Sequence, residues 1–192
     1  IWDERKRSLF VARDRMGEKP LVYQHTEGRF LFASEIKSLL QAPDVHRTMD
    51  PEALQQYLTF GYVPHPRTMF RDIRKLPPAH FATFEQGVLD IQRYWHPDWE
   101  QVDERPVSVL REELREELTA SVRLQLRSDV PLGAFLSGGI DSTTIVGLMQ
   151  SLVTHQAKTF TMGFAESAYD ETPHAREAAE HLGSQHHELA ID

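Results

Sequence analysis

Short apolar runs separated by turn residues dominate the first hundred residues, and this pattern predicts antiparallel strands joined by hairpins. Such strands are expected at 8–12, 21–25, 29–33, 80–85 and 88–94. Ser34 is placed to cap a short helix over 35–41. A second helix is predicted between Asp50 and Gly61, because Asp is a favoured cap, Pro51 suits the first turn and Gly follows the last. The first half is therefore expected to be mainly antiparallel β with short helices.

The pattern changes after a polar stretch with two prolines at 97–106, which is predicted to be a linker. An aliphatic residue at every fourth position from Leu110 to Leu126 predicts an amphipathic helix over 107–127. The following segments are expected to be strand 130–136, helix 141–154, strand 158–164, helix 173–182 with Thr172 as its cap, and strand 186–191. Strands that alternate with helices in this way predict a parallel sheet with right-handed crossovers.

Composition narrows the classes of function. Acidic residues outnumber basic ones 29 to 21 among 192 residues, for a net charge of -8, which argues against nucleic acid as a main partner. No apolar run approaches the ~20 residues of a membrane span, so a soluble, cytoplasmic protein is expected. The sequence has no cysteine, which excludes disulfides, thiolate metal sites and a thiol nucleophile within these residues. The chain starts at Ile1 and both ends run through strand-like segments, so we expect a fragment of a longer protein.

The candidate chemistry lies in the segment Ser-Gly-Gly-Ile-Asp-Ser at 137–142, between a predicted strand and a predicted helix. Two glycines let the backbone fold tightly and bring its N–H groups against an anion, and the helix start adds partial positive charge. Ser137 and Ser142 can add hydroxyl donors, while Asp141 suits a magnesium ion that bridges to phosphates. The alternative is a plain strand–turn–helix junction in which Asp141 only caps the helix. No lysine follows the glycines, so the segment differs from the GxxxxGK[ST] phosphate loop.

This segment resembles the SGGxDS pyrophosphate loop of the N-type ATP pyrophosphatases, which include asparagine, GMP, NAD and argininosuccinate synthetases. Its flanks, and segments along nearly the whole chain, are similar to the glutamine-dependent asparagine synthetase family. The segments that carry this resemblance are 127–133, 13–21, 32–37, Tyr169-Asp170-Glu171, 181–183 and 186–188.

The resemblance implies two domains. Residues 1–100 would be the C-terminal part of a type-2 glutamine amidotransferase domain with an α+β N-terminal nucleophile fold. Residues 105–192 would be the N-terminal part of an ATP-pyrophosphatase domain, an α/β Rossmann-like parallel sheet of the adenine nucleotide alpha hydrolase type. The implied activity is asparagine synthase (glutamine-hydrolysing), which converts ATP, aspartate and glutamine to asparagine, glutamate, AMP and pyrophosphate.

The resemblance also places parts of the machinery outside these residues. The glutaminase cysteine would lie before Ile1 and a second synthetase motif after Asp192, so the fragment has no catalytic residue of its own and is expected to be inactive alone. The expected ligands are ATP, Mg²⁺, aspartate and glutamine, with neither nucleic acid nor a membrane as partner. The full-length protein could form a homodimer.

Site residues follow from the resemblance position by position. The ATP site would comprise Phe135, Leu136, Ser137, Gly138, Gly139, Ile140, Asp141, Ser142 and Met162. Within it Asp141 would hold the metal, and Met162 matches a position that contacts adenine, although simple core packing explains it equally well.

Two acidic residues and two histidines outside the loop have alternative interpretations. Asp170 and Glu171 could assist magnesium or substrate, but a loop that leads into the capped helix is favoured. His186 and His187 are adjacent in a predicted strand and should point to opposite faces, which argues against one shared metal ion.

Two rival functions stay open at this point. The first is the same architecture with another carboxylate substrate, as in β-lactam synthetase or the amidotransferases of polysaccharide and peptide modification, and the 62–66 segment hints at that wider group. The second is a nucleotide-binding homologue without ligase activity. Asp141 argues against the second, because a non-catalytic site has no use for a buried magnesium carboxylate.

Overall fold

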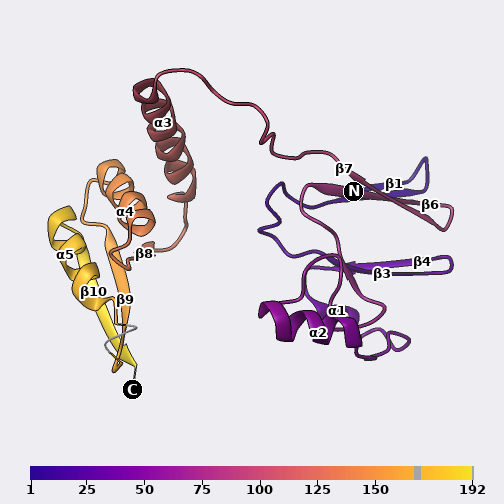
Figure 1. Cartoon of the computed structure of the whole chain (residues 1–192). Helices are drawn as coiled ribbons and strands as arrows, with labels where there is room; N and C mark the ends of the chain where they lie inside the picture. The colour runs from indigo at the N-terminus through magenta and orange to yellow at the C-terminus, as the bar shows by residue number, and fades with distance from the viewer. Residues whose placement is uncertain (167–169, 192) are drawn as a thin grey trace. The chain divides into compact units, whose positions relative to one another are not determined.

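The computed structural model describes residues 1–166 and 170–191, and the chain divides into two compact units, 1–102 and 103–192 (Figure 1). Tyr169, which contributes to one segment of the family resemblance, lies outside the described residues. Within the described residues, no helix is both long and apolar enough to cross a membrane.

The first unit contains two antiparallel sheets, as predicted. One sheet has the order β1-β2-β6-β7, formed by β1 (Trp2–Asp3), β2 (Ser8–Ala12), β6 (His80–Glu85) and β7 (Val88–Arg93). The other has the order β4-β3-β5, formed by β4 (Arg29–Ala33), β3 (Val22–Thr26) and β5 (Arg74–Lys75). Their apolar residues form two buried clusters, one around Val22 and Ile73 and one around Val11 and Leu76. The predicted strand boundaries are confirmed to within one residue.

Two helices complete this unit, α1 (Ile36–Leu39) and α2 (Pro51–Phe60). The start of α2 is confirmed in detail, because the Asp50 carboxylate accepts hydrogen bonds from the N–H groups of Glu52 (3.0 Å) and Ala53 (3.4 Å). Gly61 ends α2 in the left-handed conformation, with φ of 76°.

The cap predicted at Ser34 is wrong. Glu35 occupies the N-cap position of α1, and no side chain caps that helix among the described residues. The helix is also one turn long, shorter than predicted, because the chain continues past Leu39 in tight turns that bond Gln41 to Ser38 and Ala42 to Leu39. Burial of Leu39 in the Val22 cluster holds this turn in place of a cap.

The second unit is a three-stranded parallel sheet with helices packed on it, as predicted. Its elements are α3 (Val107–Gln125), β8 (Gly133–Phe135), α4 (Ile140–Leu152), β9 (Lys158–Phe164), α5 (Thr172–Leu182) and β10 (Gln185–Ile191). The strand order is β10-β9-β8, and both pairings are parallel. The strand predicted over 130–136 is shorter in the structure, because β9 begins at Lys158 and gives β8 no partner before Gly133.

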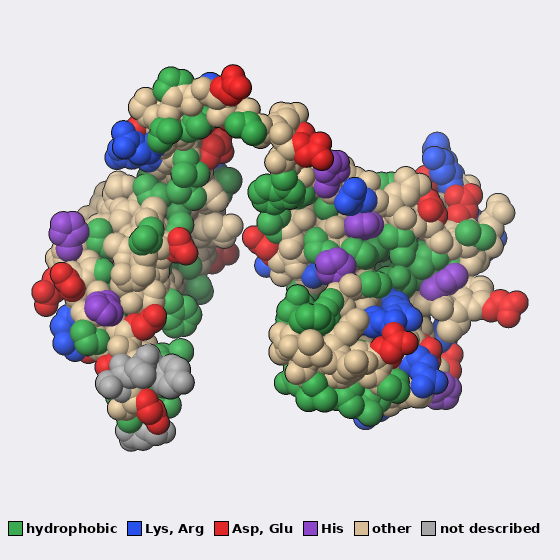
Figure 2. Space-filling model, in the orientation of Figure 1, with side chains coloured by type: hydrophobic (Ala, Val, Ile, Leu, Met, Phe, Trp, Pro, Cys, Tyr) green, Lys and Arg blue, Asp and Glu red, His purple; other side chains and the backbone are tan. Residues whose placement is uncertain are grey.

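The two faces of this sheet differ. Leu136 at the end of β8 packs with Val146 of α4 and Ala175 of α5, so both helices lie on the face that buries Leu136. Along β9 the side chains alternate, with Thr159 and Thr161 buried and the residues between them exposed in part. Phe160, Met162 and Phe164 therefore share the face that α4 and α5 leave uncovered. Apolar side chains are visible at the surface of both units in Figure 2.

The cap predicted at Thr172 is also wrong. Glu171 occupies the N-cap position of α5 and Thr172 is the first helical residue. The acceptor for the Thr172 N–H is the carboxylate of Asp170 (3.2 Å), so the capping side chain belongs to a residue two positions earlier. The predicted end of α5 at Gly183, with φ of 67°, is confirmed.

Candidate functional site

The loop between β8 and α4 is held in shape by its two serines. The Ser137 and Ser142 hydroxyls hydrogen bond to each other (2.9 Å), and the Ser137 N–H donates to the Ser142 hydroxyl (3.2 Å). The Ser142 hydroxyl also reaches the carbonyl of Gly139 (3.3 Å), whose N–H donates to the Ser137 hydroxyl (3.3 Å). The hydroxyls expected to serve an anion are thus already used to close the loop.

The two glycines of the loop have different structural requirements. Gly138 has φ of +81°, and a Cβ there would lie 2.5 Å from the carbonyl carbon of His174 in the first turn of α5. Both the conformation and the close approach of α5 therefore demand glycine at this position. Gly139 has φ of -71° and ψ of 164°, and a Cβ there would meet only the Ser137 hydroxyl at 3.4 Å. The described residues give no steric reason for glycine at 139, which leaves the backbone open to close approach by a ligand.

The beginning of α4 is open to solvent. Gly139 is its N-cap, and among the described residues no side chain makes a capping hydrogen bond there. Ile140 at the first helical position is 87% exposed, and Asp141 beside it is exposed as well. The first N–H groups of a helix have no partner within the helix, and together they carry partial positive charge. The 13-residue α4 therefore presents a site suited to an anion, shaped by the loop before it.

This geometry corrects two expectations about Asp141. It is the second residue of α4 and makes no capping hydrogen bond, so the helix-cap alternative is wrong. The argument from a buried carboxylate is also wrong, because Asp141 is exposed. An exposed carboxylate next to an anion site is accessible to a cation that accompanies the anion.

A cavity of about 220 Å³ adjoins the loop at the ends of β8 and β9. It is lined by Phe135, Leu136, Ser137, Phe160, Thr161, Met162, Phe164 and Glu171. The structure thus brings four of the predicted site residues together, Phe135, Leu136, Ser137 and Met162. Sequence reasoning missed Phe160 and Phe164, although the two-residue period along β9 places them on the same face as Met162. The mainly apolar lining suits a flat, weakly polar group.

The wall of this cavity is firmly attached to the neighbouring strand. Leu136 is 1% exposed, and its N–H donates to the carbonyl of Phe160 (2.9 Å). Its own carbonyl accepts a short hydrogen bond from the Thr161 hydroxyl. The loop therefore begins from a fixed point at the carboxyl end of the sheet, where ligands bind in open parallel sheets.

The histidines have structural roles, as expected. His186 is nearly buried, and its Nδ1 hydrogen bonds to the Thr159 hydroxyl (2.9 Å), whereas the ring of His187 stacks on Phe160 with centroids 5.2 Å apart. They lie on opposite faces of the sheet. Within the described part of the chain, no group of three or more His, Cys, Asp or Glu side chains is arranged to hold a metal ion.

The chain matches two protein families over different segments. Residues 1–95 match the family described as glutamine amidotransferase domain, and residues 113–192 match the asparagine synthase family.

The chain is also similar, along nearly all of its length, to several longer proteins. The chain is 35% identical over 193 residues to a putative glutamine-hydrolysing asparagine synthetase of Methanocaldococcus jannaschii, covering 97% of the chain and 37% of that relative. It is 38% identical over 186 residues to glutamine-hydrolysing asparagine synthetase 1 of Bacillus subtilis, covering 95% of the chain and 29% of the relative. A Gibberella zeae protein named as an amidase is 32% identical over 211 residues, covering 100% of the chain and 31% of the relative. The chain spans about a third of the length of these proteins.

Proposed function

Since the chain belongs to the family of glutamine-hydrolysing asparagine synthetases, we propose that the protein containing it makes asparagine from aspartate. The reaction would use ATP and glutamine and would release glutamate, AMP and pyrophosphate. One observation carries the proposal for these residues: the uncapped start of α4 at Gly139, beside an apolar cavity at the carboxyl end of β8.

The pyrophosphate and the adenine of ATP each have a matching feature. The first-turn N–H groups of α4 would donate hydrogen bonds to the pyrophosphate oxygens. The missing side chain of Gly139 would let these oxygens approach the backbone. Phe135 and Met162, which line the 220 Å³ cavity, would hold the adenine ring. Leu136 directly precedes the loop and is buried, whereas Ile140 lies within it and is exposed; both would contribute backbone groups to the site.

Asp141 is the proposed ligand for magnesium. Mg²⁺ commonly binds one or two protein carboxylates and completes its shell with substrate phosphates and water. A single exposed carboxylate next to the proposed pyrophosphate position fits this pattern, and it agrees with the lack of a preformed metal cluster among the described residues. Bound magnesium would supply neutralisation of the phosphate charge.

The two units are assigned to two domains with different activities. We propose that residues 1–100 belong to a type-2 glutamine amidotransferase domain of the N-terminal nucleophile fold. Residues 105–192 would belong to a Rossmann-like ATP-pyrophosphatase domain. The antiparallel sheets of the first unit and the parallel sheet of the second are compatible with these assignments. The protein is proposed to act in the cytoplasm, without nucleic acid partners, and to form a homodimer.

A second candidate is the same adenylating chemistry on another carboxylate. The fungal relative named as an amidase, which the chain matches along its whole length, favours keeping it. The third candidate is nucleotide binding without ligase activity. The three candidates differ in product rather than in the nucleotide site.

The deciding experiment supplies the full-length protein with MgATP, aspartate and glutamine, or ammonia in place of glutamine. We expect asparagine, AMP and pyrophosphate in equal amounts. Formation of AMP and pyrophosphate only with a different carboxylate would establish the second candidate. Binding of ATP without any turnover would establish the third, and release of ADP and phosphate would contradict all three.

A further inference from the structure

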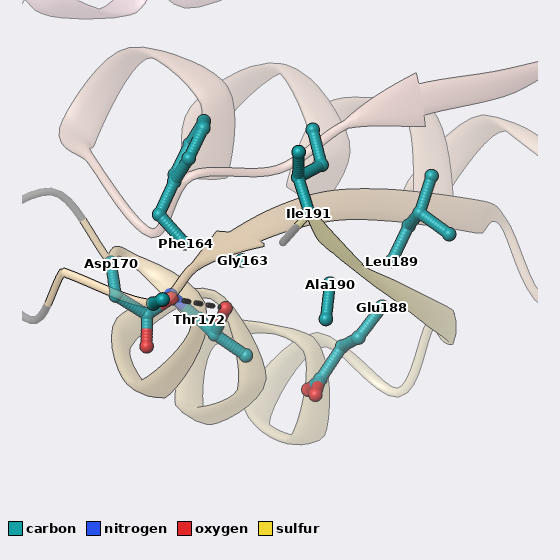
Figure 3. Close-up of a pocket in the computed structure, with 9 residues that line it drawn as sticks. Gly163, Phe164, Asp170, Thr172, Glu188, Leu189, Ala190 and Ile191 are labelled. Carbon is teal, nitrogen blue, oxygen red and sulfur yellow. Dashed lines mark hydrogen bonds between the residues drawn. The ribbon is translucent and has the colours of Figure 1, made fainter.

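Asp170 binds the first residue of α5, where that helix begins beside the end of β9. Its carboxylate Oδ1 accepts hydrogen bonds from the Thr172 hydroxyl (2.6 Å) and from the Thr172 N–H (3.2 Å). Thr172 is buried over Gly163 of β9, where a Cβ would lie 2.8 Å from the Thr172 hydroxyl oxygen and 3.4 Å from Asp170 Oδ1. Figure 3 shows Asp170 and Thr172 beside Gly163, with the bond between them dashed. The missing side chain of Gly163 thus makes room for this contact.

A second and separate contact fastens α5 to β10. The Arg176 guanidinium donates two hydrogen bonds to the Glu188 carboxylate, at 2.9 and 2.8 Å. This pair is partly exposed and lies one turn further along the helix. The Arg176 pair joins α5 to a strand, whereas the Asp170 contact acts on the first turn of the helix.

The first turn of α5 is also the surface on which the phosphate loop folds. The backbone of His174, two residues after Thr172, lies so close to Gly138 that a Cβ on Gly138 would meet the His174 carbonyl oxygen at 2.6 Å. Ala175 in the same turn is fully buried against Leu136 and Val146. A shift of this turn would therefore change the space in which Gly138 adopts its positive φ.

Asp170 itself is not part of the loop or of the cavity next to it. It lines a different cavity of about 270 Å³, together with Thr172, Glu188 and Ile191, and none of residues 137–142 line that cavity. The hydroxyl and N–H of Thr172 hold the pKa of the Asp170 carboxyl below its ordinary value, so the carboxylate is charged at neutral pH and is a strong acceptor. Because Asp170 binds the first residue of α5, that helix connects it to the loop.

We propose that Asp170 is a positioning residue for the pyrophosphate loop. By holding Thr172 at the start of α5, close to Gly163, it fixes the backbone of His174 and so the conformation of Gly138. The consequence for ATP rests on the function proposed above, whereas the consequence for the loop's conformation does not.

The first measurement is hydrogen–deuterium exchange of the full-length protein without nucleotide. Asp170→Ala should speed exchange in 137–142 and 172–176 and leave the first unit unchanged, because the opening is local. Arg176→Gln is the matched control, and we expect it to leave exchange in 137–142 at the wild-type rate. Unchanged exchange of the loop in Asp170→Ala, or an equal increase in Arg176→Gln, would overturn the proposal.

The second measurement is the dissociation constant for MgATP. Asp170→Ala should raise it about tenfold, the usual scale for the loss of a helix-capping side chain that binding depends on. Asp170→Asn should stay within about threefold of wild type, because its amide oxygen still accepts from Thr172. The double variant Asp170→Ala with Thr172→Val should lose clearly less MgATP affinity than the product of the two single losses, because both residues act through one contact.

The outcomes separate the two claims. Failure of the wild type to bind MgATP would defeat the proposed function but would leave the exchange measurement as a valid test of positioning. Two results would show that Asp170 contacts the ligand directly and would overturn the positioning role. One is an Asp170→Asn variant that binds MgATP as weakly as Asp170→Ala. The other is an affinity loss that multiplies fully with that of Thr172→Val. A lower melting temperature with unchanged MgATP affinity would overturn it as well.

Discussion

Helices α2 and α4 begin in opposite ways. At α2 the Asp50 carboxylate is 6% exposed, accepts two N–H groups of the first turn and pairs with Arg67 (3.0 Å). At α4 the corresponding position is Gly139, which offers no side chain, and the residue after it is 87% exposed. The unpaired N–H groups of a helix start need an acceptor from somewhere. At α2 the chain supplies it, and at α4 the structure leaves it to another molecule.

A helix start therefore stabilises the first unit, whereas in the second unit it provides a binding site. A capped start contributes to folding but has no free donors, whereas an open start contributes less to folding and can bind an anion. The same division separates Gly138, required by the fold, from Gly139, which the fold does not require. Variants at these positions should therefore affect either stability or binding, depending on the residue.

The largest effect is expected for Asp141→Asn. The change keeps the shape of the side chain and removes the charge proposed to hold magnesium. Pyrophosphate release, measured with aspartate and ammonia supplied directly, should fall by more than about a hundredfold. Because Asp141 is exposed and makes no capping hydrogen bond, the melting temperature should barely move, and glutamine hydrolysis should persist as the internal control. Near-normal pyrophosphate release would remove Asp141 from the site.

Gly138→Ala should damage both binding and folding. A side chain at φ of +81° costs about 1–2 kcal/mol, and overlap with the His174 backbone adds to this cost. The control is Gly61→Ala in the first unit, where φ is +76° but a Cβ would meet nothing within 4 Å. Denaturant unfolding should show a larger loss for Gly138→Ala than for Gly61→Ala. Equal losses would mean that the contact with α5 carries no weight.

Gly139→Ala should affect binding alone. Its backbone angles suit alanine and its Cβ has room, so stability should stay within about 0.5 kcal/mol of wild type. A methyl group facing the pyrophosphate would displace at least one hydrogen bond to a charged oxygen, worth about 1.5–3 kcal/mol. The MgATP dissociation constant from calorimetry should therefore rise about tenfold or more. Unchanged affinity would show that no ligand approaches the backbone at 139.

Asp50→Ala should affect stability and leave binding unchanged, and its effect should be the smallest of those predicted here. Loss of the α2 cap should lower the melting temperature of the first unit by about 5 °C, because its first-turn N–H groups lose their acceptor. Asp50→Asn should lower it less, since asparagine still caps but no longer pairs with Arg67 as a charge. MgATP affinity should equal that of the wild type in both variants. A change in affinity would contradict the assignment of the α2 cap to folding alone.

These contrasts also show how far sequence reasoning reaches. Elements with a local signal were predicted well, such as the Asp50 cap and β9, whose side chains alternate over its whole length. Ser34 and Thr172 have the side chains of good caps, yet neither caps a helix. No side chain caps α1 among the described residues, and the Thr172 N–H donates to Asp170, two residues earlier. The strand predicted over 130–136 was too long, because the start of β9 limits the residues with which β8 can pair. The loop at 137–142 could be found from its sequence, whereas its contact with His174 and the cavity wall at Phe160 depend on chain packing.

The most direct test of the central claim is residue-resolved hydrogen–deuterium exchange of the full-length protein with and without MgATP. We expect slower exchange of the amides of residues 138–142 on addition of nucleotide, because the first-turn N–H groups of α4 acquire an acceptor. The first turn of α2, at residues 52–54, should exchange at the same rate in both states, since Asp50 already serves it. Unchanged exchange at 138–142 under saturating MgATP, or equal protection of both helix starts, would contradict the claim that the open start of α4 binds the pyrophosphate of ATP.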